Sequence, residues 1–350
     1  MSSQVFPAVA AVVLGLLVGF VLFVPLVAVS YRRRGTLTPA RFALWAAALV
    51  YFLALWTYTL LPLPASDSYA CAPAVLSLAP TIDDVAAAFA HGRPWTDVRL
   101  LQVVFNVALF VPAGIFVRLL ARRGVVTALL VGGAVSLLIE LTQVTGVWGV
   151  FPCAYRMFDV GDLVTNTSGA VIGAAVALLI PGRAGGVERL PGADEPRPVT
   201  RGRRLLAMLC DVLAASVVAA LAGTAVQVWL QYVARDRDAV LDGVIAGLAN
   251  TATPIAVTLV LTLATGRSIG DLAVQLRYRG DVLPAPLARL LRWAGGIGGI
   301  LVANTLPSPF SLVGGLLVLL GVVLVFTTDR GRGLPGVVSA QRLEDARSRY

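Results

Sequence analysis

The chain contains no lysine, only one histidine, and only 13% charged residues among its 350 positions. A soluble domain carries about 25% charged residues and roughly 45–50% apolar ones. Here 58% of the residues are hydrophobic and the mean hydropathy is +0.84. This composition excludes an ordinary soluble domain and predicts a polytopic membrane protein that binds membrane lipids. All 28 basic residues are arginine, and their distribution explains the formal charge of +9 better than a nucleic-acid partner does.

Residues that could bind a metal or cofactor are also scarce. Cys71, Cys153 and Cys210 form no CxxC pair, and His91 is the single histidine, so no zinc-type ligand set exists. The chain has no nucleotide-binding loop, GxSxG or HExxH motif. We therefore expect no cofactor, although carboxylates of the chain could hold a divalent cation.

Nine apolar segments are long enough, at about 20 residues each, to cross a hydrocarbon core of about 30 Å. The sequence thus predicts an all-α transmembrane bundle of about nine spans. They lie near residues 7–29, 42–62, 101–120, 125–145, 162–181, 205–232, 243–265, 288–306 and 310–327. A stretch rich in Gly, Pro and Arg divides five spans from four. The predicted parts are a first module at 1–181, a cytoplasmic linker at 182–203, a second module at 204–328 and a cytoplasmic tail at 329–350.

Arginine is distributed unevenly between the connections, with 23 on one side of the predicted spans and 5 on the other. The positive-inside rule therefore predicts an outer N-terminus and an inner C-terminus. Cys71 and Cys153 then lie outside, where an oxidising environment permits a disulfide, and the sequence leaves open whether they pair. The outer loop that contains Cys71 also contains residues 81–84, whose sequence predicts the start of a helix at the membrane surface. The N-terminal apolar run lacks a basic n-region, so we expect no cleaved signal peptide.

The most informative stretch is RMFDVGDLVTNTSGAVIG, from Arg156 to Gly173. Five of its residues recur at steps of three and four and so share one face of a helix. They are Asp159, Asp162, Asn166, Gly169 and Gly173. The outer part of this face is polar, whereas the inner glycines allow a neighbouring helix backbone to approach closely. Charged groups inside a membrane need partners, which other spans must supply.

The preceding two spans carry polar residues at the same predicted depth. Asn106 lies on the third span above Pro112, and Ser136, Glu140 and Gln143 share one face of the fourth. We expect a single outer cluster of seven residues. They are Asn106, Glu140, Gln143, Arg156, Asp159, Asp162 and Asn166.

Two interpretations of this cluster remain open. Arginine and asparagine could neutralise the carboxylates and lock three helices together. Alternatively, Arg156 could bind the phosphate of a lipid head group, while the carboxylates hold a divalent cation or act as general acid and base. Three carboxylates against one arginine leave excess negative charge, which favours a cation or a raised pKa over mutual neutralisation.

Three ordered motifs, NVALFVPAG at 106–114, ELTQ at 140–143 and the stretch at 156–173, resemble the VanZ family of bacterial membrane proteins. The resemblance covers about residues 45–181. It implies a multi-pass protein of the cell envelope, in a family named for a protein linked to teicoplanin resistance. The expected function is binding of a lipid-linked or glycopeptide-antibiotic-related ligand at the outer polar site. An intramembrane hydrolase or transferase acting on a lipid phosphate and a small-solute transporter are the alternatives.

The second module resembles the RDD family over roughly residues 200–328. In the run RLLAMLCD, Arg204 and Asp211 match the first two signature positions of that family. Asp271 and Arg279 stand where members often carry a lysine and an aspartate, so the charges are inverted there. The ligand or transport role proposed for the family is therefore not carried over to this chain.

Asp211 is the lone carboxylate of the sixth predicted span, so it must be paired or neutral. Arg204 lies two turns away on the same helical face, roughly 10 Å along the axis. We expect Asp211 to pair with Arg204 or with Arg289 or Arg292. The alternative is a protonated Asp211 that donates to a backbone carbonyl.

Overall fold

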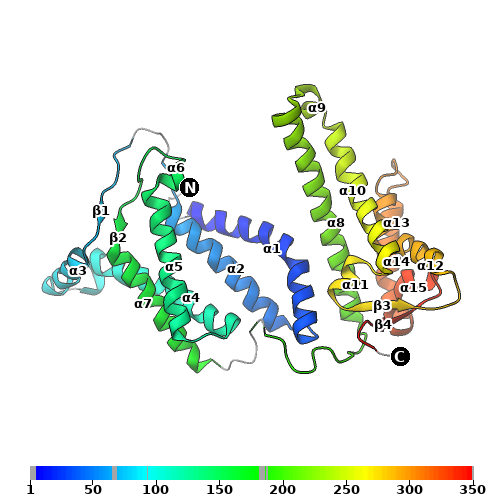
Figure 1. The fold of residues 1–350 in the computed structure, drawn as a ribbon, viewed down its shortest axis with the longest axis horizontal. Coiled ribbons are helices and arrows are strands. Elements are labelled where there is room, and N and C mark those ends of the chain that lie inside the picture. Colours follow the sequence, from blue (N-terminus) through cyan, green and yellow to red (C-terminus); the bar gives the residue numbers. More distant parts are fainter. Residues whose placement is uncertain (1–4, 65–68, 93, 181–185, 187, 349–350) are drawn as a thin grey trace. The chain divides into compact units, whose positions relative to one another are not determined.

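The computed structural model describes residues 5–64, 69–92, 94–180, 186 and 188–348, and this part of the chain is nearly all helical (Figure 1). The predicted all-α class is therefore confirmed. Seven helices within the described ranges are long and apolar enough to cross a membrane. They are α1 (Val5–Arg34), α2 (Pro39–Leu60), α4 (Val98–Ala121), α5 (Val125–Val144), α7 (Val160–Val176), α8 (Arg201–Trp229) and α10 (Val244–Thr265).

The last two predicted spans differ from expectation. Residues 288–306 do not form one helix, because α12 (Ala285–Ala294) and α13 (Ile297–Ala303) are separated at Gly295 and Gly296. Gly296 adopts φ −116° and ψ −136°, which breaks the helical hydrogen bonding. The last apolar helix, α14 (Leu312–Thr327), has 16 residues and extends about 24 Å. The number of helices that cross a membrane, and their orientation, stay predictions.

The chain divides into two compact units. Unit 1 comprises residues 1–19 and 38–188, and unit 2 comprises residues 20–37 and 189–350. The division falls inside the predicted linker, of which residues 182–185 and 187 lie outside the described residues. The end of α1 is grouped with unit 2, and the assignment of residues 1–181 and 204–328 to two modules stays a prediction.

Residues 329–348 fold onto unit 2 instead of extending as a tail. They form η4 (Asp329–Gly331), α15 (Gly333–Val338) and β4 (Arg342–Asp345). The strand pairs antiparallel with β3 (Leu276–Arg279), with Tyr278 opposite Leu343. Leu343 and Asp345 are buried, whereas Arg342 and Glu344 are not. This alternation with period two is typical of a strand, in which successive side chains point to opposite faces.

In unit 1, helices α4, α5 and α7 lie side by side (Figure 1). Their close approach depends on the glycines of α7. A Cβ atom added at Gly169 would lie 2.1 Å from the carbonyl oxygen of Val107, and one at Gly173 would lie 1.9 Å from that of Val111. As expected from the glycine face of α7, the backbones of α4 and α7 touch where no side chain larger than hydrogen fits.

The connections of unit 1 are tied together at the start of α7. Strand β1 (Ala74–Val75) pairs in parallel with β2 (Phe158–Asp159), and Cys71 and Cys153 form a disulfide with a Cα–Cα distance of 5.6 Å. The structure thus resolves the open question of their pairing in favour of a bond.

The connection before α4 contains the short surface helix α3 and, after it, η1 (Pro94–Thr96). A further short helix, α6 (Gly146–Gly149), follows α5. Helix α3 (Ala79–Ala90) begins two residues earlier than the sequence pattern predicted, because Pro80 occupies its first turn. Thr81 contacts Gly161 instead of capping: a Cβ at that glycine would lie 1.9 Å from the Thr81 hydroxyl.

In unit 2, helices α8 and α10 run side by side and are joined by η3 (Leu230–Ala234) and α9 (Arg237–Asp242) (Figure 1). The short helix α11 (Ile269–Ala273) packs on α8 through Gly270, where a Cβ would lie 1.9 Å from the carbonyl oxygen of Ala207. The contact adjoins a hydrophobic core that includes Val27, Cys210, Val274, Leu276 and Leu343. The core therefore places the N-terminus of α11 against the polar face of α8.

Candidate functional site

Two hydrogen bonds join α7 to its neighbours in unit 1. Asn106 on α4 donates from Nδ2 to Oδ1 of Asp162 in the first turn of α7, at 2.5 Å. Asn166, one turn further along α7, donates from Nδ2 to Oγ of Ser136 on α5, at 3.0 Å. The structure thus brings together, in two pairs, polar residues that the sequence placed at one depth on three helices.

Glu140 and Asp159 fix the start of α7. Glu140 is 3% exposed, and its Oε2 accepts a hydrogen bond of 3.0 Å from the backbone N–H of Asp159. Asp159 is the N-cap of α7 and accepts from the backbone N–H of Gly161 at 2.7 Å. Negative groups are favourable at a helix N-terminus because unpaired N–H groups and the helix dipole both face them. Glu140, Asp159 and Asp162 also repel one another.

Arg156 and Gln143 bind the end of α2, not the carboxylates. Arg156 donates from Nη2 to the carbonyl of Leu61 at 2.8 Å, and Gln143 donates from Nε2 to that of Thr59 at 2.7 Å. The last carbonyls of a helix lack partners within the helix and attract positive charge. Among the described residues Arg156 forms no ion pair, which argues against the interpretation in which it neutralises the carboxylates directly.

The side chain preceding Arg156 follows the same pattern. Tyr155 donates its hydroxyl to the carbonyl of Leu60 at 3.2 Å. Burial raises the pKa of Tyr155, while the charge of Arg156 acts in the opposite direction. Tyr155 is therefore a neutral hydrogen-bond donor, and the local positive charge resides on Arg156 alone.

The cluster in unit 1 thus combines carboxylates and amide side chains around the start of α7 with the half-buried Arg156, which binds the end of α2. Oδ1 of Asn166 is buried and accepts no hydrogen bond from the described residues. Within the described ranges, no three His, Cys, Asp or Glu side chains are grouped closely enough to hold a metal ion. The site as it stands fits a ligand that carries both an anion and hydrogen-bond donors better than it fits a bare divalent cation.

In unit 2, the ion pair of α8 differs from the predicted one. Arg204 donates from Nη1 to Oδ1 of Asp271 at 2.9 Å. Asp211 instead accepts from the backbone N–H of Gly270 at 2.7 Å and from the hydroxyl of Ser268 at 2.8 Å. Ser268 and Asp271 form a capping box at the start of α11, which directs the Asp271 carboxylate toward Arg204. The sequence-based pairing of Asp211 with an arginine is therefore wrong.

A second buried ion pair holds the C-terminal strand. Arg203 lies 2.8 Å from Oδ2 of Asp345, and Arg347 lies 2.6 Å from the same oxygen. Burial alone would raise the pKa of Asp345, but hydrogen bonds from Arg347, from the Arg197 backbone and from Arg203 hold it well below its usual range. The sequence did not predict this pair, because residues 342–345 are mostly charged and carry no alternating apolar pattern that would signal a strand.

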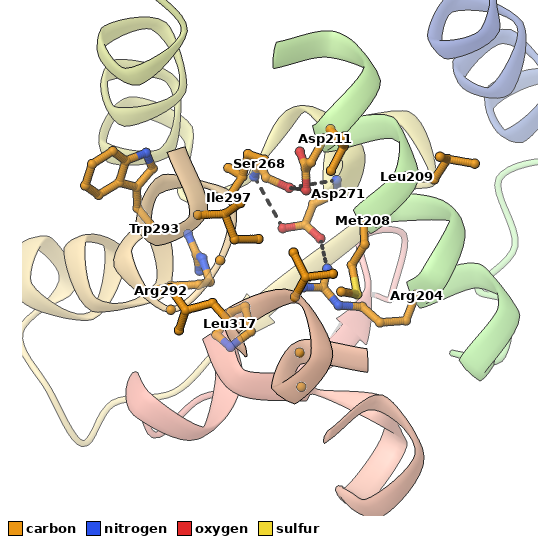
Figure 2. Close-up of a pocket in the computed structure, with 18 of the residues that line it drawn as sticks. Arg204, Met208, Leu209, Asp211, Ser268, Asp271, Arg292, Trp293, Ile297 and Leu317 are labelled. Atoms are coloured by element: carbon orange, nitrogen blue, oxygen red, sulfur yellow. Dashed lines mark hydrogen bonds and ion pairs between the residues drawn. The ribbon is translucent and has the colours of Figure 1, made fainter. Parts of the chain in front are cut away.

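A cavity of about 270 Å³ lies beside the Arg204–Asp271 pair (Figure 2). Residues of α8, α11, α12, α13 and α14 line it, so it is internal to unit 2. Its polar end is formed by Arg204, Asp211, Ser268, Asp271 and Arg292. Only Arg204 and Asp211 were predicted site residues, because the others lie in the first turn of α11, at its N-cap and on α12 of the broken eighth span.

Comparison with known proteins supports the assignment of the first module. Residues 48–181 match the VanZ/LLP1 family model, a range that contains all seven predicted polar residues of unit 1. No match was found among curated proteins or among solved structures. The family match does not extend to residues 200–328, so the RDD resemblance stays a prediction. Residues 48–181 are thus similar to the VanZ/LLP1 family, and the long apolar helices are those of a membrane protein.

Proposed function

We propose that the VanZ-like module binds the phosphate-bearing head group of a lipid-linked ligand at the outer face of a bacterial cell membrane, which the chain crosses several times. The observation that carries this proposal is the state of Arg156. Its guanidinium group donates to one backbone carbonyl and forms no ion pair with the described residues. A guanidinium group has five N–H donors in a planar fork that suits phosphate. Arg156 therefore keeps donors for an anion.

The carboxylates and amides of the cluster complement a different part of such a ligand. Asp159 and Asp162 are only partly buried, so they present oxygen acceptors and would repel a second phosphate. Hydroxyl and amide N–H groups of a sugar or peptide can donate to them. A polyprenyl phosphate that carries a saccharide or peptide has both features, and so has a glycopeptide-related ligand. The cluster is consistent with recognition of the junction between the lipid phosphate and its polar cargo.

The disulfide supports the outer location of this site. The Cys71–Cys153 bond joins the two connections that meet at the start of α7, beside Asp159. Disulfides persist on the oxidising side of a membrane and are rare in the cytosol. This agrees with the side assigned by arginine distribution.

Binding to matched lipids tests the proposal. The full chain, in phosphatidylcholine nanodiscs, is titrated with polyprenyl phosphate and with the polyprenol of equal length. We expect the phosphate to bind at least about tenfold more tightly, because a charge-assisted bidentate contact is among the stronger hydrogen bonds. Arg156→Gln should remove that preference. Equal affinity for the two lipids in the wild-type chain would refute the proposal.

Arg99→Gln is the matched control. Arg99 is 41% exposed and already paired with Asp97 at 3.0 Å, so its loss should leave the preference unchanged. Mass analysis of the recovered lipid distinguishes binding from the hydrolase or transferase alternative, because cleavage or transfer changes the ligand mass. Uptake of the labelled lipid into sealed vesicles would indicate the transporter alternative. Raised tolerance of teicoplanin in a sensitive host that expresses the chain would link the site to resistance.

A further inference from the structure

We propose that the cavity of unit 2 binds an organic anion with a short apolar body, that is, an amphiphile with a carboxylate or phosphate head, and that Arg292 holds the head. This site is formed by residues of unit 2 that do not belong to the VanZ-like module, and nothing in the proposed function of that module requires it. The inference rests on the charges of the cavity wall, on an unsatisfied buried donor and on the apolar lining.

Arg292 is a buried cation without a carboxylate partner. Arg292 is only 4% exposed. Its guanidinium group donates from Nη1 to Oε1 of Gln341 at 3.0 Å and from Nη2 to the carbonyl of Gly266. Both acceptors are neutral. No carboxylate among the described residues lies within ion-pair distance of Arg292. Buried charges are costly unless they are paired, so an anion from outside the chain would complete this site.

The carboxylates at the cavity are already engaged elsewhere. Asp271, which attracts Arg292 most strongly, is paired with Arg204. Asp211 accepts from Ser268 and Gly270. Figure 2 shows Asp211 beside Ser268, whereas Arg292 lies near Ile297 and Trp293. Asp271 therefore attracts Arg292 without contacting it, and neither carboxylate forms an ion pair with Arg292 among the described residues.

A second donor in the wall also lacks a partner. Arg204 is 4% exposed, and its buried Nε–H donates to no acceptor among the described residues. The guanidinium groups of Arg204 and Arg292 both lie over the ring of Tyr278, at 5.6 Å and 5.1 Å from its centre. Orphaned buried N–H groups are rare in folded proteins, and a bound acceptor is one explanation for them. The positive end of the cavity thus offers two guanidinium groups held by one aromatic ring.

The rest of the wall is apolar and sets the size of the ligand. Met208, Ile297 and Leu317 line it, together with the backbone at Gly321. A volume of about 270 Å³ is slightly below the ~300–1,000 Å³ of typical small-molecule pockets. Such a space holds a head group and a short chain, and is too small for a whole diacyl lipid.

Octanoate and octyl phosphate are suitable probes. Retention of each labelled probe is measured on the full chain in phosphatidylcholine nanodiscs, with empty nanodiscs subtracted. Octanol, acetate and inorganic phosphate are the competitors. We expect octanoate or octyl phosphate to bind and octanol to compete at least about tenfold more weakly, because it lacks the charge that Arg292 binds. Competition by acetate or inorganic phosphate at equal concentration would show an adventitious ion only and would overturn the proposal.

Two variants locate the binding. Arg292→Gln should weaken octanoate binding at least about tenfold, whereas Arg289→Gln should not, because Arg289 lies on the same helix but donates to the Leu263 carbonyl and does not line the cavity. If Arg292→Gln does not fold, Gly321→Val replaces it. A Cβ at Gly321 would meet only the mobile end of Met208, at 3.3 Å, so the added side chain should fill space and exclude the probe. Octanoate binding that survives each folded variant would refute the proposal, and Arg156→Gln should leave it unchanged.

Discussion

Arg204 and Asp271 form an ion pair of 2.9 Å in which the side chains are only 5% and 3% exposed. The pair joins α8 to the capping box that starts α11, and it borders the cavity of unit 2. Each side chain of the pair compensates the buried charge of the other, so removal of either one leaves an uncompensated buried charge and destabilises the fold.

Asp271→Asn should therefore destabilise the chain by about 3–5 kcal/mol, because Arg204 would lose the one carboxylate that pairs with it among the described residues. Asp211→Asn should cost only about 1 kcal/mol, because Asp211 is held by hydrogen bonds from neutral donors. Thermal unfolding of both variants in one neutral detergent gives the comparison. A larger loss for Asp211→Asn would show that Asp211 carries the ion pair.

The contact of α4 with α7 predicts a steep dependence on side-chain size. Gly173→Ala adds an atom 1.9 Å from the carbonyl oxygen of Val111, so the helices must separate. We expect a loss of about 1–3 kcal/mol or more in the free energy of unfolding. Gly202→Ala is the control, because its new methyl group meets nothing within 4 Å and Ala is the better helix former. Similar melting temperatures for the two variants would contradict the packing described.

The Cys71–Cys153 disulfide closes a separation of 82 residues. Its removal by Cys71→Ser with Cys153→Ser should cost about 2–5 kcal/mol, because the unfolded chain gains freedom. A reductant should lower the melting temperature of the wild-type chain and leave this double variant unaffected. Cys210→Ala should keep the response to reductant, since Cys210 is a buried free thiol. A wild-type melting temperature that ignores reductant would mean the bond is absent.

The pKa of Asp345 is lowered in the folded chain relative to about 3.9 when unfolded, so the ionised carboxylate stabilises the fold at pH values above the unfolded pKa. That stability is lost as the pH falls from about 4 toward the folded pKa. The difference in stability between the wild-type chain and Asp345→Asn should be constant between about pH 5 and pH 8 and smaller at pH 3. Unfolding measured at both ends of this range checks the sign. A difference that grows on acidification would show that the carboxylate is not favoured in its charged form.

Sequence periodicity was sufficient for the long helices and for the shared face of α7, because local spacing determines which residues point the same way. It also predicted that Asn106, Glu140, Asp162 and Asn166 would face neighbouring helices. Hydrogen-bond partners were not predictable in this way. The partners of Arg156 and Asp211 depend on where a disulfide-tied loop and the capping box of α11 place backbone groups, which no helical period encodes.

The broken eighth span and the C-terminal strand were missed for related reasons. The hydropathy of residues 288–306 shows only that the segment is apolar. It does not show that the helix is interrupted at Gly295 and Gly296. Residues 342–345 are mostly charged, so they read as a solvated tail. Burial of Asp345 becomes favourable only once Arg203 and Arg347 are brought to it by tertiary folding.

Under the proposed function, Arg156 contributes more to ligand binding than to the stability of the fold. The direct test measures polyprenyl phosphate affinity and thermal unfolding on the same samples of wild-type chain and Arg156→Gln. We expect Arg156→Gln to lose at least about tenfold in affinity for polyprenyl phosphate. Its free energy of unfolding should fall by only about 1 kcal/mol, because the hydrogen bond to Leu61 is lost. Unchanged affinity together with a stability loss of about 3–5 kcal/mol, as for a broken buried ion pair, would contradict it.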